Sequence, residues 1–362
     1  MKLGLFWYWT IGRGVFTLVN KLNKKYNCEI KKVFDLPFKK DELKELLVTD
    51  INEIINDDEI ATVVEVLGGH DLPYEVISRC LAKGKNVITA NKEVVSLHLQ
   101  EFISLAHENN CSFCFEASAG GGIPIIRTLI DNLKVNEVND IYGILNGTTN
   151  YILTKMADED LSFEDALDLA KKNGFAEANP TADLEGLDIV RKINILSSLA
   201  FSGVINNDDI YHYGITGVNK NILNKIKELG YSLKYVASSY KNQDNDVLIR
   251  VEPTIVKANH PFSSIKYEFN AILYTGSTND NLMFYGKGAG SIPTATAIVS
   301  DLVSILENRA YIDFDVKNIL SVNKNIKNPY TYYIFDENGD FEVKSNVSDN
   351  ELQSAKFYAR VL

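Results

Sequence analysis

The sequence has few of the features that would place the protein in a membrane or on a nucleic acid. No apolar run in its 362 residues approaches the roughly 20 residues that span a bilayer. Basic residues are outnumbered, with 37 Lys and Arg against 48 Asp and Glu, for a net charge of −11. This balance excludes a nucleic-acid or anionic-membrane partner. The 45% hydrophobic and 23% charged residues are ordinary for a soluble globular chain of two or three domains.

Cysteine is also scarce. The four cysteines are Cys28, Cys80, Cys111 and Cys114. Cys111 and Cys114 have the C-x-x-C spacing, but they lie in an expected strand, where residues i and i+3 point to opposite faces. Because no second cysteine pair completes a zinc site, we expect four buried, reduced thiols.

Residues 1–118 alternate between short apolar runs and helical patterns. The expected strands are 2–6, 30–34, 61–67, 86–89 and 112–115, and the expected helices are 12–24, 40–55, 73–83 and 97–109. This alternation predicts an α/β fold with a parallel, doubly wound sheet of Rossmann type. The N-terminal apolar segment is short, is followed by Arg13 and lacks an A-x-A cleavage pattern, so we interpret it as the first strand of a cytoplasmic protein.

The turn after the first expected strand has too little glycine. A dinucleotide-binding fold has G-x-G-x-x-G here, so that the backbone turns tightly and touches the pyrophosphate. This chain has Trp7 and Trp9 at the first two glycine positions and keeps only Gly12. An indole at the second position would fill the space of the pyrophosphate, although the amides of the helix that opens at Gly12 and Gly14 still attract an anion.

Charges near residue 35 leave the choice of dinucleotide open. Asp35 lies about twenty residues after the turn, where an acidic residue bonds the ribose 2′-hydroxyl of NAD. Lys39 and Lys40 would instead suit the 2′-phosphate of NADP, and each of these charges also fits a solvated side chain.

Residues 143–203 concentrate charged side chains among residues typical of a core. Asn179 and Pro180 are a helix start, with Asn as the N-cap and Pro at the first helical position. Apolar residues then recur at helical spacing, at Ile189, Ile193 and Leu196. We therefore expect one helix from about residue 180 to 200.

On that helix Lys192 lies on a face that becomes apolar one turn later, and Asp188 lies one turn before it. One interpretation is a surface ion pair at i,i+4, which would contribute a few tenths of a kcal/mol. The continuation of the face as Ile195, Leu196 and Leu199 favours the other interpretation, a partly buried lysine and carboxylate at the mouth of a pocket. Such pairs are common in acid–base chemistry.

Five stretches resemble the homoserine dehydrogenases and follow one another in the order of that family. They are V-I-T-A-N-K-E (87–93), F-E-A-S-A-G-G-G-I-P-I-I (115–126), N-G-T-T-N-Y-I-L-T-K-M (146–156), G-F-A-E-A-N-P-T-A-D-L-E-G-L-D-I-V-R-K (174–192) and G-K-G-A-G-S-I-P-T-A-T-A-I-V-S-D-L (286–302). The resemblance implies reversible reduction of L-aspartate 4-semialdehyde to L-homoserine by NAD(P)H, in threonine, methionine and isoleucine biosynthesis, by a homodimer. The first turn departs from the family, whose members have the glycines there.

The resemblance also implies roles for particular residues. Lys192 matches the proton donor, Asp188 is placed to orient it, and Lys92 lies between cofactor and substrate. The substrate ammonium would be held by Glu177, Asp183 and Asp188, and the carboxylate by Gly147 and Thr148; taken singly, Glu177 and Asp183 also fit a helix-capping role. The implied cofactor contacts are Thr10, Ile11, Gly12, Gly68, Lys92 and Gly288.

The glycine-rich loop after the fifth expected strand matches the family's monovalent-cation site. A carboxylate and backbone carbonyls of Glu116, Ala119, Gly121 and Ile123 would hold Na⁺ or K⁺. The same loop is equally typical of a strand-to-helix connection without an ion.

The expected domains follow from these patterns. We expect a dinucleotide-binding domain over 1–125, an α+β catalytic and dimerisation region over 126–285, a return segment to the first domain over 286–310, and a tail over 311–362. Within the second region, Ser162 and Asp165 predict a helix start and Gly174 its end, and residues 246–253 and 271–276 read as strands. Residues 330–344 predict a hairpin, and the tail is expected to be too short for a complete regulatory ACT domain.

Two other functions stay open at this point. The chain could be a catalytically silent homologue that serves as a binding or regulatory protein, because Trp7 and Trp9 replace cofactor glycines. It could also be a dehydrogenase for a different small amino-acid aldehyde. Titration with NADH and NADPH distinguishes the first alternative, and substrate profiling distinguishes the second.

Overall fold

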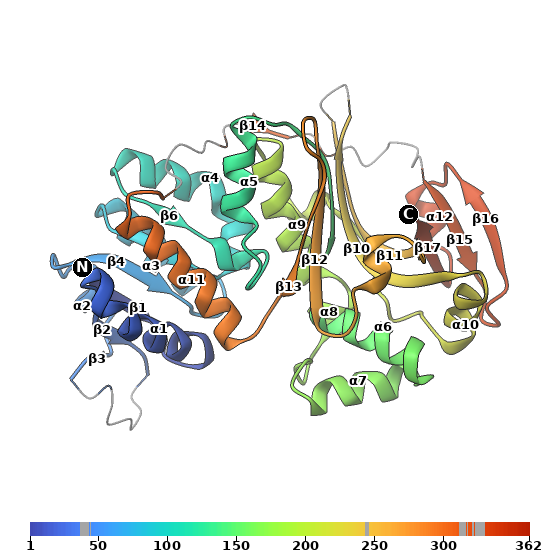
Figure 1. Ribbon diagram of the computed structural model, residues 1–362, viewed down its shortest axis with the longest axis horizontal. Coiled ribbons are helices and arrows are strands. Elements are labelled where there is room, and N and C mark those ends of the chain that lie inside the picture. Colours follow the sequence, from blue (N-terminus) through green and yellow to red (C-terminus); the bar gives the residue numbers. More distant parts are fainter. Residues whose placement is uncertain are drawn as a thin grey trace. The chain divides into compact units, whose positions relative to one another are not determined.

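The computed structural model describes residues 1–36, 43, 45–242, 246–310, 316, 318–320, 322 and 330–362. Lys39 and Lys40 lie outside these residues. The chain divides into two compact units (Figure 1): unit 1 comprises 1–135, 198–204 and 289–318, and unit 2 comprises 136–197, 205–288 and 319–362. Within the described residues, no helix combines the length and apolar character required to cross a bilayer.

Unit 1 is built on a six-stranded sheet with the order β3-β2-β1-β4-β5-β6. All of its pairings are parallel. The strands are β1 (Lys2–Phe6), β2 (Glu29–Phe34), β3 (Leu47–Val48), β4 (Ile60–Glu65), β5 (Asn86–Thr89) and β6 (Phe113–Cys114). The predicted doubly wound sheet is confirmed, and the N-terminal apolar segment is its central strand β1.

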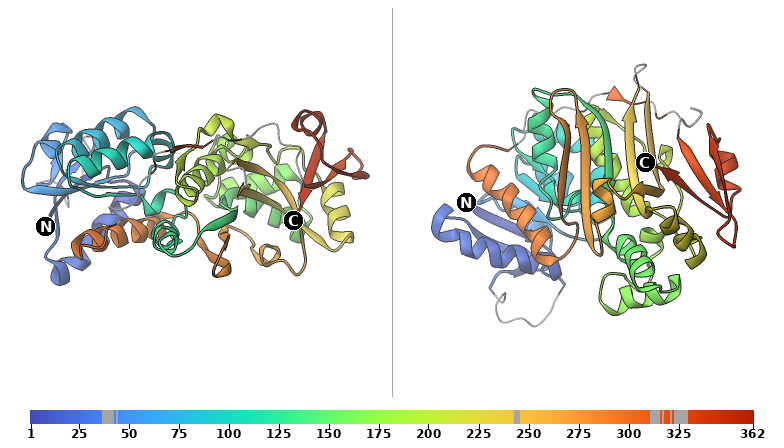
Figure 2. Two further views of the ribbon diagram at one scale, coloured as in Figure 1. Left: turned by 90° about the horizontal axis from the view of Figure 1, so that it is seen from above. Right: turned by 45° about the vertical axis from the view of Figure 1, so that its right-hand side comes forward.

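Helices cover both faces of this sheet (Figure 2, left). On one face α1 (Thr10–Tyr26) packs against α11 (Ser291–Leu306), and on the other α3 (Asp71–Ala82) packs against α4 (Lys92–Glu108). Gly14 permits the close approach of α1 and α11, because a Cβ there would lie 2.8 Å from the Cβ of Ala295. The unit also contains α2 (Asn52–Ile55), η2 (Glu116–Ser118) and α5 (Ile126–Leu133).

The helix predicted over residues 40–55 is wrong for the part that the structure describes. Leu47 and Val48 form β3, which pairs with Val33 and Phe34 of β2, and only the short helix α2 follows. The segment at Leu47 and Val48 is extended, and its backbone pairs with the outer edge of β2.

All four cysteines are buried and free, as predicted. Burial raises the pKa of Cys80 to about 12 and that of Cys111 to about 11. Because the thiolate is the reactive form, the raised pKa values and the burial of Cys80 and Cys111 favour a packing role for these two thiols.

Unit 2 is built on a nine-stranded sheet with the order β13-β12-β7-β10-β11-β17-β15-β16, and β9 pairs with β11. Its strands are β7 (Val138–Ile144), β9 (Tyr211–His212), β10 (Tyr231–Lys241), β11 (Val247–Lys257), β12 (Phe269–Gly276), β13 (Asp280–Lys287), β15 (Thr331–Phe335), β16 (Phe341–Ser345) and β17 (Phe357–Val361). Its helices are α6 (Gly147–Glu159), α7 (Phe163–Lys172), α8 (Thr181–Leu184), α9 (Leu187–Ala200), α10 (Lys220–Glu228), α12 (Asp349–Gln353), η3 (Asn207–Asp209) and η4 (Pro261–Ser264). Both α6 and α10 pack against β10. Apart from the two large sheets, β8 (Gly203–Val204), which belongs to unit 1, pairs with β14 (Asn318–Ile319).

Several local predictions in unit 2 are confirmed. Ser162 is the N-cap of α7 and accepts a hydrogen bond from Asp165 N at 3.1 Å. Gly174, just past the end of α7, has a φ of +76°, which favours glycine. The predicted strands are β11 and β12, and the hairpin is β15–β16. The last strand, β17, pairs in parallel with β11, so the end of the chain is part of the unit 2 sheet.

Candidate active site

The N-terminus of α6 is fixed by two close contacts. Asn146 is its N-cap, and the Oδ1 atom accepts a hydrogen bond from Thr149 N at 2.9 Å. Gly147 follows, and a Cβ there would lie 2.7 Å from the carbonyl oxygen of Glu268, so only glycine fits. The first amides of α6 are therefore held in place and face no intrahelical partner, which suits an anionic group.

Asn146 also joins α6 to a network of charged side chains. Its Nδ2 atom donates to Asp183 Oδ1 at 2.7 Å and to Asp188 Oδ2 at 3.0 Å. Asp188 Oδ2 lies 2.8 Å from Lys192 Nζ, which donates to the carbonyl oxygen of Leu145 at 2.8 Å. The structure thus brings together three predicted residues, Asp183, Asp188 and Lys192, and adds Asn146, which was not among the predicted site residues. A capping residue directly before Gly147 is the sequence feature that could have indicated it.

Lys192 and Asp188 are buried, with 8% and 7% of their surfaces exposed. The interpretation as a surface ion pair is therefore wrong. An ammonium has three N–H groups, and among the described residues Leu145 and Asp188 engage two of them. The arrangement leaves one donor for an oxygen atom of a ligand.

The single helix predicted over 180–200 is in fact two helices, α8 and α9. Gly186 separates them with a φ of +86°, and a Cβ there would lie 2.1 Å from the hydroxyl oxygen of Tyr235. Glu185 therefore lies in the break and is not on the helix of Lys192. Pro180 is the residue before α8 rather than its first helical residue, and Asn179 Oδ1 accepts from Thr181 N at 3.3 Å.

The other predicted site residues of unit 2, for substrate or cofactor, are placed differently from one another. Asp183 belongs to the network described above. Thr148 donates its hydroxyl to the carbonyl oxygen of Phe175 at 2.5 Å, which ties the first turn of α6 to the loop after α7. Glu177 is exposed on that loop and makes no hydrogen bond or ion pair with the described residues. Gly288 lies against β12, because a Cβ there would be 1.8 Å from Nδ2 of Asn270.

In unit 1 the turn between β1 and α1 keeps the geometry of a glycine turn without its first glycine. Trp7 has a φ of 83°, a conformation that favours glycine. A Cβ on Gly12 would lie 2.0 Å from the carbonyl oxygen of Trp7, so Gly12 is required for this turn. Trp9 is the N-cap residue of α1 and is 58% exposed, and Thr10 and Ile11 begin the helix.

Asp35 supports this turn from the end of β2. Its carboxylate is 1% exposed, so the interpretation as a solvated charge is wrong. Oδ2 accepts from Tyr8 N at 2.9 Å, and Oδ1 accepts from Leu36 N at 2.7 Å. Asp35 therefore fixes the backbone of the turn between Trp7 and Trp9.

Gly68 and Lys92 follow neighbouring strands of the sheet, β4 and β5. Asn91 caps α4 by accepting from Glu93 N and Val94 N, and its Nδ2 atom donates to the carbonyl oxygen of Gly69 at 2.9 Å. Lys92 is the first residue of α4 and is partly buried. The two predicted positions thus lie at the carboxyl edge of the sheet, where ligands of doubly wound folds bind.

A fully buried carboxyl group, Glu65, ends β4 at the same edge. Its Oε1 atom accepts from Leu67 N at 2.6 Å, and Oε2 accepts from the hydroxyl of Thr89. Burial raises the pKa of Glu65 to about 7. The folded protein therefore holds a proton here at pH values at which an unfolded chain, with a Glu pKa of about 4.3, has lost it.

We expect Glu65→Gln to stabilise the protein above pH 7 and to have little effect at pH 5. Between the unfolded and folded pKa values the folded state binds more protons, so its stability falls as pH rises through this window, by roughly 4 kcal/mol in total. Glutamine removes that loss. Melting temperatures of wild type and variant from pH 5 to 8 should diverge as pH rises, whereas Glu108→Gln, at an exposed site on α4, should follow the wild type. Parallel curves for Glu65→Gln would contradict this assignment.

The carboxylate of Glu116 caps α5. Its Oε1 atom accepts from Ile126 N at 2.7 Å and Oε2 from Arg127 N at 2.9 Å, and burial raises its pKa. In the loop that follows, Gly121 has a φ of +60°, and a Cβ on Gly120 would lie 2.5 Å from the carbonyl oxygen of Ile123. Among the described residues no group of three or more His, Cys, Asp or Glu is arranged to hold a metal ion.

A doubly wound parallel sheet, a tight turn at the N-terminus of α1 and a buried lysine–carboxylate network define a dinucleotide-dependent oxidoreductase. A family model described as "Homoserine dehydrogenase" matches residues 124–303, and one described as "Homoserine dehydrogenase, NAD binding domain" matches residues 9–116. The chain belongs to the homoserine dehydrogenase family.

Individual relatives agree over most of the chain. The homoserine dehydrogenase of Bacillus subtilis is 39% identical over 318 residues, which cover 85% of this chain and 73% of that protein. The crystal structure of the S. aureus enzyme at pH 7.5 aligns with a TM-score of 0.81 at 30% identity and covers 100% of this chain and 98% of that one. The structure from Thiobacillus denitrificans aligns with a TM-score of 0.83 at 30% identity, over 93% and 83% of the two chains.

Proposed function

We propose that the chain interconverts L-aspartate 4-semialdehyde and L-homoserine with NADH or NADPH. The observation that carries this proposal is the buried ammonium of Lys192, which is held by Asp188 and Leu145 and, within the part of the chain that the structure describes, has one N–H group left for a ligand. In the reducing direction the dinucleotide supplies a hydride to the aldehyde carbon, and the carbonyl oxygen becomes an alkoxide. Lys192 stabilises that charge and transfers a proton to it, then regains a proton from water.

The charged groups of the substrate match the surroundings of Lys192. The α-ammonium suits Asp183 and Asp188, and the contacts favour these two over Glu177 because both accept hydrogen bonds from Asn146. The α-carboxylate suits the first amides of α6, at Gly147 and Thr148. In unit 1, Lys92 is the second candidate for proton handling.

The dinucleotide would be held by unit 1 at the edge described above. The α1 helix has no acidic residue in its first turn, so the amides at Thr10, Ile11 and Gly12 suit the pyrophosphate. Gly68 and Lys92 lie at the same carboxyl edge of the sheet, and Gly288, a residue of unit 2, is added to the proposed set because of the family resemblance. The turn at Trp7 keeps the glycine conformation, so the backbone fits a dinucleotide better than the sequence alone indicates.

We extend the proposal to a monovalent cation and a homodimer, both of which the family resemblance implies. A monovalent cation, Na⁺ or K⁺, would be held by backbone carbonyls of Ala119, Gly121 and Ile123, while the carboxylate of Glu116 keeps the loop in place. Two copies of the chain would form a homodimer through the sheet of unit 2.

The test is turnover of L-aspartate 4-semialdehyde by the purified chain, followed by loss of the reduced nicotinamide absorbance with NADH and with NADPH. Turnover with at least one dinucleotide is the expected result. Binding of dinucleotide without turnover, or no binding by a folded protein, would contradict the proposal and favour a silent homologue. Faster turnover of another small amino-acid aldehyde would show that the enzyme has a different substrate from the one proposed.

A further inference from the structure

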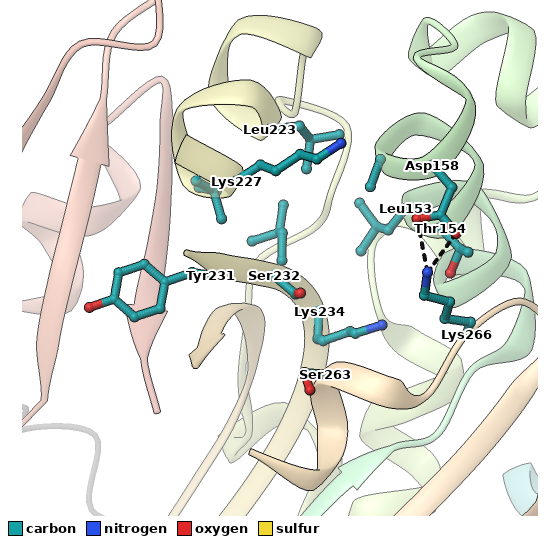
Figure 3. A pocket seen from close by; sticks show the side chains of 13 residues that line it. Leu153, Thr154, Asp158, Leu223, Lys227, Tyr231, Ser232, Lys234, Ser263 and Lys266 are labelled. Atoms are coloured by element: carbon teal, nitrogen blue, oxygen red, sulfur yellow. Dashed lines mark hydrogen bonds and ion pairs between the residues drawn. The ribbon is translucent and has the colours of Figure 1, made fainter. Parts of the chain in front are cut away.

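Unit 2 contains a cavity of about 120 Å³ whose lining includes none of the residues of the proposed active site (Figure 3). It lies between the C-terminal half of α6, α10, the start of β10 and the segment around η4. The polar and charged lining residues that matter here are Asp158, Lys227, Ser232, Lys234 and Lys266. Apolar side chains such as Leu153 and Leu223 line the remainder.

Lys234 places a poorly satisfied charge in this cavity. The residue is 4% exposed, and its Nζ atom donates one hydrogen bond, to the carbonyl oxygen of Ile265. No other hydrogen bond and no ion pair joins this ammonium to the described residues, although it carries three donors. A buried charge is costly unless it is paired, and among the described residues no carboxylate lies within ion-pair distance of this ammonium.

The remaining charges around the cavity do not supply a counterion. Asp158 is the one carboxylate among the lining residues, and both of its oxygens accept from Lys266 Nζ, at 3.0 and 2.7 Å. Lys227 adds a further ammonium from α10. With three lysines against one carboxylate, the lining carries an excess of two positive charges. Burial and the charge of Lys266 lower the pKa of Lys234 to about 8, against a smaller opposing effect of the Asp158 charge, so Lys234 is still mainly protonated at neutral pH.

We propose that this cavity is a binding site for a small organic anion. A carboxylate or phosphate group accepts hydrogen bonds from Lys234, with Lys227 and the hydroxyl of Ser232 on the same lining, and a short apolar part contacts Leu153 and Leu223. The mixture of excess positive charge and apolar walls selects an amphipathic anion over a simple halide.

The anchoring of Lys234 links this cavity to the N-terminus of α6. Asn150 of α6 donates to the same carbonyl of Ile265 at 3.4 Å, and also to the carbonyls of Tyr267 at 2.9 Å and Phe269 at 3.1 Å. The intervening Glu268 is the residue whose carbonyl oxygen closely faces Gly147. An anion that draws Lys234 away from Ile265 therefore acts on a segment that supports the proposed substrate site. This second part, an effect on turnover, rests on the proposed function.

The test is isothermal titration of the full chain with inorganic phosphate, succinate and butyrate, each against sodium chloride of equal ionic strength. We expect saturable binding of at least one probe, about 10-fold weaker in Lys234→Met, since the variant removes a charge-assisted hydrogen bond to the anion. Lys241→Met, at the other end of β10, should bind as the wild type does. Lys227→Met is the second variant, for use if Lys234→Met does not fold. It changes an exposed side chain, so it should keep the fold, and it should weaken binding about 3-fold.

The probes and the turnover assay separate the possible outcomes. Binding of phosphate alone identifies a phosphate ligand, and binding of succinate or butyrate alone identifies a carboxylate. No saturable binding beyond chloride, or equal binding by wild type, Lys234→Met and Lys227→Met, would overturn the proposal. Binding without any dehydrogenase activity would support the anion site and contradict the proposed function.

Discussion

Replacing Lys192 by methionine is expected to lower kcat for reduction of the semialdehyde by about 10³-fold, with the affinity for NAD(P)H unchanged. Methionine keeps the length of the side chain but removes the ammonium that protonates the alkoxide and stabilises its charge, two effects that are each worth about 10²-fold or more. Steady-state turnover and titration with dinucleotide together measure both quantities. A loss of kcat smaller than about 10-fold would remove Lys192 from the proposed mechanism.

The control for this variant follows from the buried network. Removal of the ammonium takes the ion pair with Lys192 away from the buried carboxylate of Asp188, which is 7% exposed, and breaking a buried ion pair by removing one partner costs roughly 3–5 kcal/mol. Lys192→Met combined with Asp188→Asn removes both charges and should recover most of the melting temperature without recovering kcat. Lys171→Met, exposed on α7, should leave both quantities unchanged.

Much of unit 1 could be predicted because its strands and helices are encoded locally. Parallel strands buried on both faces appear as short apolar runs, and β1 and β5 have the bounds expected from the sequence. The exception is β3, a two-residue strand that forms by pairing with the backbone of the edge strand β2. Its own sequence does not indicate this pairing, because the pairing depends on a strand elsewhere in the chain.

The site of unit 2 was predictable as a set of residues but not as a geometry. The burial of Lys192 could be inferred from the apolar continuation of its helix face. The break at Gly186 could not, because it depends on Tyr235, a residue of β10 whose hydroxyl occupies the space of a Cβ. Asn146 was missed for a similar reason: its amide matters through contacts to Asp183 and Asp188, 37 and 42 residues away in sequence.

The turn after β1 shows the opposite relation between sequence and structure. The two tryptophans indicate a loss of the dinucleotide turn, whereas the backbone retains it, with Trp7 in a glycine conformation and Gly12 packed against its carbonyl. Non-glycine residues in such conformations cost of order 1–3 kcal/mol. The hydrogen bond from Tyr8 N to the buried Asp35 helps to hold the turn in place. What distinguishes this chain is therefore the side chain at position 9 rather than the path of the backbone.

Trp9→Gly is accordingly expected to tighten binding of NADH or NADPH by about 10-fold or more. Glycine at this position lets the pyrophosphate approach the backbone, whereas Trp9 adds a Cβ and an indole at the N-terminus of α1. The fold should tolerate the change, since Trp9 is 58% exposed and glycine is an acceptable N-cap residue. Isothermal titration measures the affinity, and the KM for dinucleotide should fall in parallel.

A matched variant, Trp9→Ala, separates the two parts of this effect. Alanine removes the indole and keeps the Cβ, so binding intermediate between wild type and Trp9→Gly would show that backbone approach and indole bulk both limit the affinity. Equal gains in the two variants would assign the whole effect to the indole. Unchanged or weaker binding in Trp9→Gly would mean that the indole contributes to the dinucleotide site, for example by stacking, and position 9 would then be a binding residue rather than an obstruction.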